Sequence, residues 1–114
     1  MITLKTLPQA TEQEVFDHVS KHLLKQGERS RDESGGCLYR HEDLKCAAGC
    51  LIGDDEYDPN IEGFTWETLS RKKFPKNHAD LIETLQFIHD AEPVKNWRSQ
   101  LEKLAAVKNL KCNL

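Results

Sequence analysis

Three cysteines and a histidine lie close together near the middle of the chain, and their side chains are well suited to bind a metal ion. Cys37, His41, Cys46 and Cys50 follow the spacing C-x3-H-x4-C-x3-C. Thiolate and imidazole groups are common ligands of tetrahedral zinc, but the C-x2-C pairs typical of zinc ribbons are missing. The alternative is that the three cysteines pack as small buried hydrophobic side chains. The sequence favours this second interpretation and keeps a structural zinc module as a hypothesis.

An acidic run follows the cysteines and could in principle bind calcium. Aligned on Asp54, the run has acidic residues at loop positions 1, 3 and 5 of an EF-hand. Position 6 is Pro59 instead of the glycine that permits the sharp bend, and position 12 is Thr65 instead of glutamate. We therefore expect a solvated acidic loop.

Nucleophilic catalysis would require a cysteine beside a histidine and a group that orients the histidine. Cys37 with His41 or His89, and Asp90 as the orienting group, would have the required side chains, but nothing in the sequence places them together. We expect His89 to be a buried hydrogen-bonding residue that fixes a neighbouring loop. An enzyme is accordingly not expected.

A small enzyme or ligand-binding domain remains an alternative, with Tyr39, Arg40 and the GDDEY loop (53–57) as its site. This alternative requires a pocket that gathers Arg40, Asp54 and His89.

Length and charge limit the classes of function. The chain has 114 residues, of which 31% are charged, and a formal net charge of -3. Because there is no basic excess to neutralise a phosphate backbone, general nucleic-acid binding is not expected. No apolar run approaches the roughly 20 residues of a membrane span, and the N-terminus lacks the apolar stretch of a secretory signal. These features predict a cytoplasmic protein with reduced thiols and no cofactor, zinc being the one alternative.

Local signals predict helices on either side of the cysteine segment. Thr11 and Glu14 form a capping box before an apolar stripe, and Gly27 is a natural stop, which predicts a helix over 11–26. Thr65 is expected to cap a short helix and Asn77 a longer one. Pro93 suits the first turn of a last helix, so 65–107 is a helical region.

Residues 37–52 differ from these helices and indicate a hairpin. CLYR and LKCAA read as two short strands with a turn at His41–Asp43. An isolated hairpin is marginally stable, so it must pack on the helices or on another copy. The predicted fold is a single α+β domain over 1–114, with three to four helices packed around a small antiparallel β-hairpin.

The order of these segments carries a resemblance. CLYRHEDLKCAAGCLIGDDEY, then LIETLQFIHD, then Trp97, Leu101 and Leu104 resemble a family of small uncharacterised proteins from bacteriophage and bacterial genomes. The resemblance runs from about Glu14 to Leu110. It implies a small accessory protein inside a bacterial cell and no catalytic residue. Family members tend to have Arg-Gly after the tyrosine, where this chain has Arg40-His41, which weakens the zinc hypothesis further.

The resemblance implies a phage- or prophage-encoded protein. Together with the small size, the acidic pI and the lack of an active-site motif, it predicts a protein that acts by protein–protein contact, as a modulator of a host factor, and forms a homodimer. Loops carry recognition more often than packed helices do. The expected contact residues lie in the hairpin and the loop after it: Arg40, Asp54, Asp55, Tyr57 and Trp66.

Overall fold

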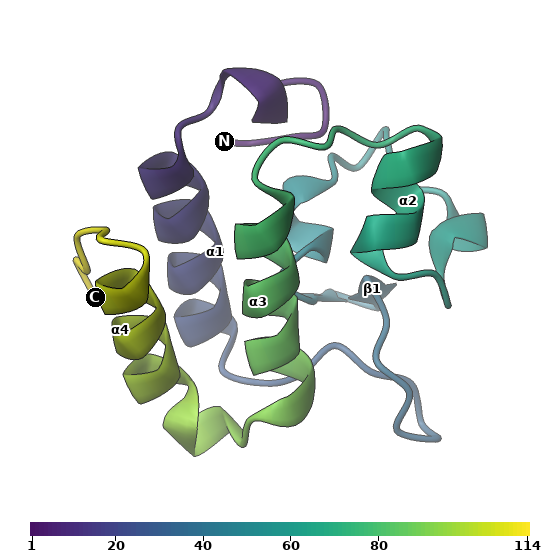
Figure 1. Cartoon of the computed structure of the whole chain (residues 1–114). Helices are drawn as coiled ribbons and strands as arrows, with labels where there is room; N and C mark the ends of the chain where they lie inside the picture. The colour runs from purple at the N-terminus through teal and green to yellow at the C-terminus, as the bar shows by residue number, and fades with distance from the viewer.

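The computed structural model describes residues 1–114 and has four α-helices and one two-stranded antiparallel sheet (Figure 1). The helices are α1 (Glu12–Gln26), α2 (Trp66–Lys72), α3 (Ala79–Ala91) and α4 (Trp97–Val107). The strands are β1 (Arg40–His41) and β2 (Leu44–Lys45). Short 3-10 turns are η1 (Leu7–Gln9), η2 (Gly49–Leu51), η3 (Pro59–Ile61) and η4 (Val94–Asn96). The predicted α+β fold is confirmed.

Three of the helices, α1, α3 and α4, pack pairwise on one another, and α2 with the hairpin lies on the far side of α3 from α4 (Figure 1). One cluster of 23 buried hydrophobic residues runs through all four helices and includes Tyr39 and Cys46, which flank the hairpin. Burying apolar side chains is the main stabilising contribution in a chain of this size. This shared core holds the loops between the elements in fixed positions.

The predicted capping signals are confirmed at α1 and α2. The Thr11 hydroxyl accepts from the Glu14 N–H at 3.1 Å, and the Glu14 carboxylate accepts from the Thr11 N–H at 2.8 Å. Gly27 ends the helix with φ at 67°. The Thr65 hydroxyl accepts from Thr68 N–H at the start of α2.

The prediction that Asn77 caps α3 is wrong. His78 occupies the cap position with a left-handed φ of 62°, and no side chain caps the first turn. The reason is a long-range contact: the His78 ring donates from Nε2 to the carbonyl of Ala10, 2.8 Å away. The histidine thus ties the start of α3 to the segment before α1.

The hairpin forms as predicted but its strands are shorter. Arg40 pairs with Lys45 and His41 with Leu44, and the chain leaves the sheet at Cys46 to enter η2. Side chains of α1 satisfy the outer edge of β2: the Lys45 carbonyl accepts from His22 and Gln26, and the Lys45 N–H donates to Gln26. These bonds replace the further strand that an open edge would otherwise recruit.

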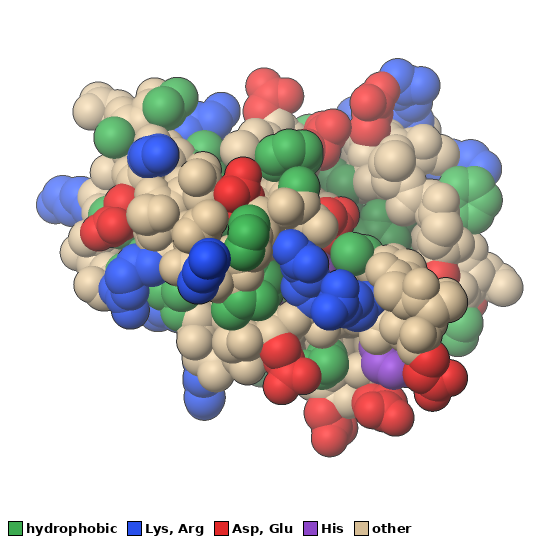
Figure 2. All heavy atoms as spheres, turned by 90° about the horizontal axis from the view of Figure 1, so that it is seen from below, with side chains coloured by type: hydrophobic (Ala, Val, Ile, Leu, Met, Phe, Trp, Pro, Cys, Tyr) green, Lys and Arg blue, Asp and Glu red, His purple; other side chains and the backbone are tan.

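Charges of both signs are mixed on the surface seen from below, where Lys and Arg side chains lie next to Asp, Glu and apolar ones (Figure 2). No helix combines the length and the apolar character that crossing a membrane requires.

Candidate functional site

Arg40 is the centre of a group of contacts that fixes the loop after the hairpin. Its guanidinium donates to the Ile52 carbonyl at 2.6 Å, pairs with Asp54 at 2.8 Å, and lies 5.1 Å from the centre of the Tyr57 ring. This hydrogen-bonded ion pair lowers the pKa of Asp54. The Arg40 side chain is only 16% exposed. Its contacts are thus made within the chain.

The Glu62 carboxylate completes this arrangement. It accepts from the backbone N–H groups of Tyr39 and Arg40 at 2.8 and 3.2 Å, and from the Tyr57 hydroxyl at 2.7 Å. Of the five predicted contact residues, the structure therefore gathers Arg40, Asp54 and Tyr57. Asp55 is exposed on the same loop. Trp66 is buried at the start of α2 and forms part of the wall of a separate cavity.

The four predicted zinc ligands do not come together. Cys46 is buried and its sulfur accepts from the Gly49 N–H at 3.2 Å, while the Cys50 thiol donates to the Ala47 carbonyl at 3.0 Å. Burial raises the pKa of both thiols, that of Cys50 to about 12. His41 pairs with Leu44 across the hairpin. The packing interpretation holds for Cys46 and Cys50, because both side chains lie among core residues and burial favours the protonated thiol over the thiolate that zinc needs.

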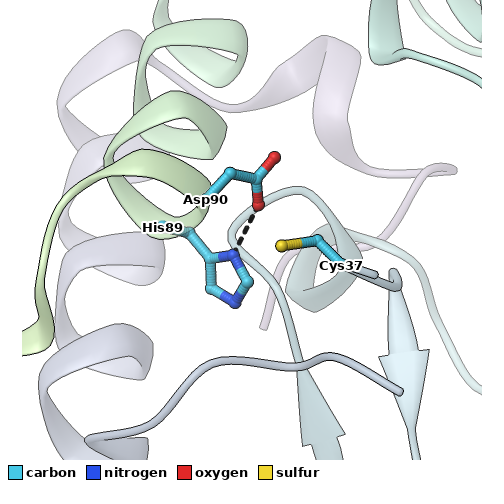
Figure 3. A group of neighbouring side chains, drawn as sticks. All are labelled: Cys37, His89 and Asp90. Carbon is cyan, nitrogen blue, oxygen red and sulfur yellow. Dashed lines mark hydrogen bonds and ion pairs between the residues drawn. The ribbon is translucent and has the colours of Figure 1, made fainter. Parts of the chain in front are cut away.

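A different group has its possible ligand atoms within 4.8 Å of one another: Cys37, His89 and Asp90 (Figure 3). His89 is completely buried on α3. Its Nδ1–H donates to Asp90 Oδ1 at 2.7 Å, and its Nε2 accepts from the Ser30 N–H at 2.9 Å. A backbone N–H can only donate, so Nε2 carries the lone pair and Nδ1 the proton. The predicted role of His89, a buried residue that fixes a loop, is confirmed.

This tautomer suits neither a metal site nor a nucleophile. A histidine that binds a metal through Nδ1 donates from Nε2 to an acceptor, but here Nε2 faces a donor. Burial and the Asp90 carboxylate raise the pKa of Cys37, which keeps its thiol protonated. A histidine that activates a cysteine must accept the thiol proton on a free ring nitrogen. In His89 the Nδ1 atom is bonded to Asp90 and the Nε2 atom to the Ser30 N–H. The group therefore has a positioning role: it joins α3 to the loop that precedes the hairpin.

The pocket that the enzyme alternative requires is not formed. Asp54 pairs with Arg40 at the surface, whereas His89 stacks on Trp97 in the core, with 5.6 Å between the ring centres.

One cavity, about 550 Å³, lies between α1, the hairpin turn and the N-terminal segment. His18, His22 and Gln26 line it on one face of α1. The two histidines donate from Nε2 to the carbonyls of Cys50 and Lys45, at 3.0 and 2.9 Å. These side chains thus fasten the segment 45–50 to α1, which is a structural role.

Stability is expected to fall in acid because of His22. Burial lowers the pKa of His22 below its ordinary value of 6.5. The folded state therefore binds the proton less readily than the unfolded state, so this contribution is complete above about pH 6.5 and is lost as the pH falls through the lower folded pKa. Urea unfolding of the wild type and of His22→Gln between pH 8 and pH 5 measures it. We expect a weaker pH dependence in the variant; an unchanged slope would show that His22 does not titrate in this way.

Alkylation distinguishes packed cysteines from metal ligands. Cys37 and Cys112 are exposed, Cys50 is half-buried and Cys46 is buried. With iodoacetamide at pH 8, we expect Cys112 to react first, Cys37 more slowly because of its raised pKa, and Cys46 only as fast as the protein unfolds. Peptide mass spectrometry measures each rate. A chelator that exposes Cys37, Cys46 and Cys50 together would restore the zinc hypothesis.

The second cavity, about 380 Å³, is a groove bounded by the segment before the hairpin, the start of α2 and the outer face of α3. Four aromatic rings line it: Tyr39, Phe64, Trp66 and Phe87. Three carboxylates also line it, Glu62, Glu83 and Asp90, and its lining contains no lysine, arginine or histidine. Phe64 and Phe87 are 45% and 62% exposed. Large aromatic side chains with this exposure are typical of a binding surface.

The α3 side of the groove is well positioned. Glu83, Phe87 and Asp90 stand at i, i+4 and i+7, which places them along one face of the helix. Gln86 accepts from the Ala48 N–H at 2.9 Å and donates to Asp90 at 2.7 Å, so it links this face to the hairpin segment. Glu83 has no hydrogen bond or ion pair in the chain. The groove thus offers one free carboxylate beside two exposed rings.

Trp66 is the one predicted contact residue that lines this groove; the other lining residues are not predicted from the sequence. A signal was present: Phe87 falls outside the apolar stripe of α3 and is flanked by acidic residues at helical spacing. The sequence does not show that Phe64 lines the same groove as Phe87, because this depends on how α2 packs on α3.

Comparisons of this chain with models of protein families, with curated proteins and with solved structures gave no match.

Proposed function

We propose that this protein is a non-enzymatic accessory protein that acts by binding a segment of a partner protein in the groove between α2 and α3. The observation that carries the proposal is the pair of exposed rings, Phe64 and Phe87, that line one cavity together with the buried aromatic residues Tyr39 and Trp66. Interfaces of this kind are enriched in aromatic residues, and a few of them supply most of the binding energy.

The setting we propose is the one that the family resemblance implies. The protein would be encoded by a phage or prophage, act in the cytoplasm of the bacterial host and modulate a host factor. A homodimer is part of the same proposal, with the second copy on a face other than the groove. Sedimentation equilibrium tests the dimer separately from the groove.

Replacement of one exposed ring is expected to weaken binding of the partner. Phe87→Ser deletes a side chain that is 62% exposed, so we expect the fold to tolerate it and the affinity to fall about tenfold or more. Val107→Ser is the matched control, because Val107 is 81% exposed on α4 and does not line the groove. Tagged wild type and both variants are used to capture proteins from bacterial cells, and captured proteins are quantified by mass spectrometry.

The proposal requires one protein that is captured with the wild type and Val107→Ser and lost with Phe87→Ser. Equal capture by all three forms, or loss only with Val107→Ser, would contradict it. Circular dichroism of the three proteins shows whether any loss of capture reflects loss of folding.

A further inference from the structure

The groove between α2 and α3 has a charge as well as a shape. Its lining combines four aromatic rings with three carboxylates and contains no lysine, arginine or histidine; the one recorded cation beside it is Lys72, whose Nζ lies 5.0 Å from the centre of the Phe64 ring. The chain as a whole has 16 Lys and Arg against 19 Asp and Glu, so a lining with acidic groups alone departs from the average surface. Complementary charge is what orients and selects a partner at an interface.

The three carboxylates are not equally available. Glu62 is occupied by two backbone N–H groups and the Tyr57 hydroxyl. Asp90 accepts from His89 and Gln86 through Oδ1 alone. Glu83 is half-buried and has no partner in the chain. The groove therefore retains one unpaired carboxylate, Glu83, and one free carboxylate oxygen on Asp90.

Glu83 and the partly occupied Asp90 lie on either side of an aromatic ring. Glu83, Phe87 and Asp90 follow one another along one face of α3, so Phe87 stands between the two acidic groups. A planar guanidinium can stack on an aromatic face and donate to a carboxylate in the same plane, whereas an ammonium group acts as a point charge. This arrangement of ring and acid is therefore better matched by arginine than by lysine.

Trp66 adds an unpaired donor to the same lining. Its side chain is 2% exposed, and its indole N–H has no hydrogen-bond acceptor in the structure. Buried indole N–H groups usually have a partner. A backbone carbonyl of a bound segment is the type of acceptor that this indole N–H lacks. An extended protein segment carries such carbonyls at regular spacing.

We infer that the groove recognises an extended protein segment in which an arginine stands next to an apolar residue, the arginine binding at Glu83 and Phe87 and the apolar side chain between Phe64 and Phe87. This inference rests on the proposed function and specifies the partner of the same site. A second copy of this chain, or a segment without a cation, is a competing occupant that the experiment distinguishes.

A displayed library of random peptides, selected on the intact protein, tests the inference. We expect the enriched peptides to share an arginine beside an apolar residue. Replacement of that arginine by alanine, and the variant Glu83→Gln, should each weaken binding of the selected peptide about tenfold in fluorescence titrations. Glu102→Gln, an exposed position on α4 outside the groove, is the matched control and should leave the affinity unchanged.

The outcomes separate the two proposals. One outcome is that the enriched peptides lack a cation, bind Glu83→Gln as well as the wild type and bind Phe87→Ser more weakly. This result would overturn the arginine preference and leave the protein-binding groove intact. Peptides that bind Phe87→Ser as well as the wild type, or a selection that enriches nothing, would overturn both. If the enriched peptides match the sequence of a segment of this chain, the groove would be assigned to a second copy of the protein, and the inference would also be overturned.

Discussion

Replacement of Gly49 by alanine is expected to destabilise the protein more than the same replacement at any other glycine. A Cβ atom at this position would lie 2.1 Å from the Tyr39 carbonyl oxygen and 2.9 Å from the Tyr39 carbonyl carbon. Both atoms belong to the backbone next to β1, so relief of the overlap requires η2 and the hairpin to separate. Overpacking typically costs about 1–3 kcal/mol, and because the neighbour here is backbone that cannot rotate away, we expect a cost of about 3 kcal/mol. Urea unfolding followed by circular dichroism measures the cost.

Gly36→Ala is the matched control for this prediction. A Cβ at Gly36 would meet only the Asp32 carboxylate, at 3.3 Å, in an exposed turn where the side chain can move. We expect a change in unfolding free energy within about 1 kcal/mol of zero. If Gly49→Ala were as stable as Gly36→Ala, the close contact between η2 and the first strand would not exist in solution.

Removal of the His89 ring is expected to have the second largest effect. His89→Ala leaves the buried Ser30 N–H without an acceptor, which costs about 1–3 kcal/mol. It also leaves a cavity beside Trp97, whose ring stacks on the imidazole. Together these losses predict a destabilisation of about 3 kcal/mol or more, measured by denaturant unfolding.

His89→Gln separates the two contributions. The glutamine oxygen can take the place of Nε2 as acceptor for Ser30, so we expect this variant to be more stable than His89→Ala by about 1 kcal/mol or more. Hydrogen exchange of the Ser30 amide should be fast in His89→Ala and slow in His89→Gln. Equal stability and equal exchange in the two variants would show that the ring acts by packing alone.

The parts of the fold that could be predicted from the sequence are those with local signals. The capping box at Thr11 and the stop at Gly27 involve residues within one turn of the helix end, so their pattern is visible in the sequence. The hairpin was visible for the same reason, through its turn at Glu42 and Asp43. Its length was not, because the side chains of His22 and Gln26, on a distant helix, hold the edge of β2.

The parts that could not be predicted depend on contacts between distant segments. Cys37 and Asp90 are brought together because Ser30 binds His89, and no periodic pattern connects these positions. Arg40 is predicted as a contact residue because it lies in the hairpin, and hairpins and loops often carry recognition. The structure shows that the Arg40 charge is used internally, by Asp54 and the Ile52 carbonyl. The groove is not visible in the sequence because its lining comes from three separate segments.

The central claim is that the groove, and no other surface, receives the partner. A nuclear magnetic resonance titration of the ¹⁵N-labelled protein with the captured partner, or with the selected peptide, tests it most directly. The account predicts that the amides that shift lie in 37–39, 62–66 and 83–90. Shifts confined to 18–26 and 43–54, around the larger cavity, would contradict it.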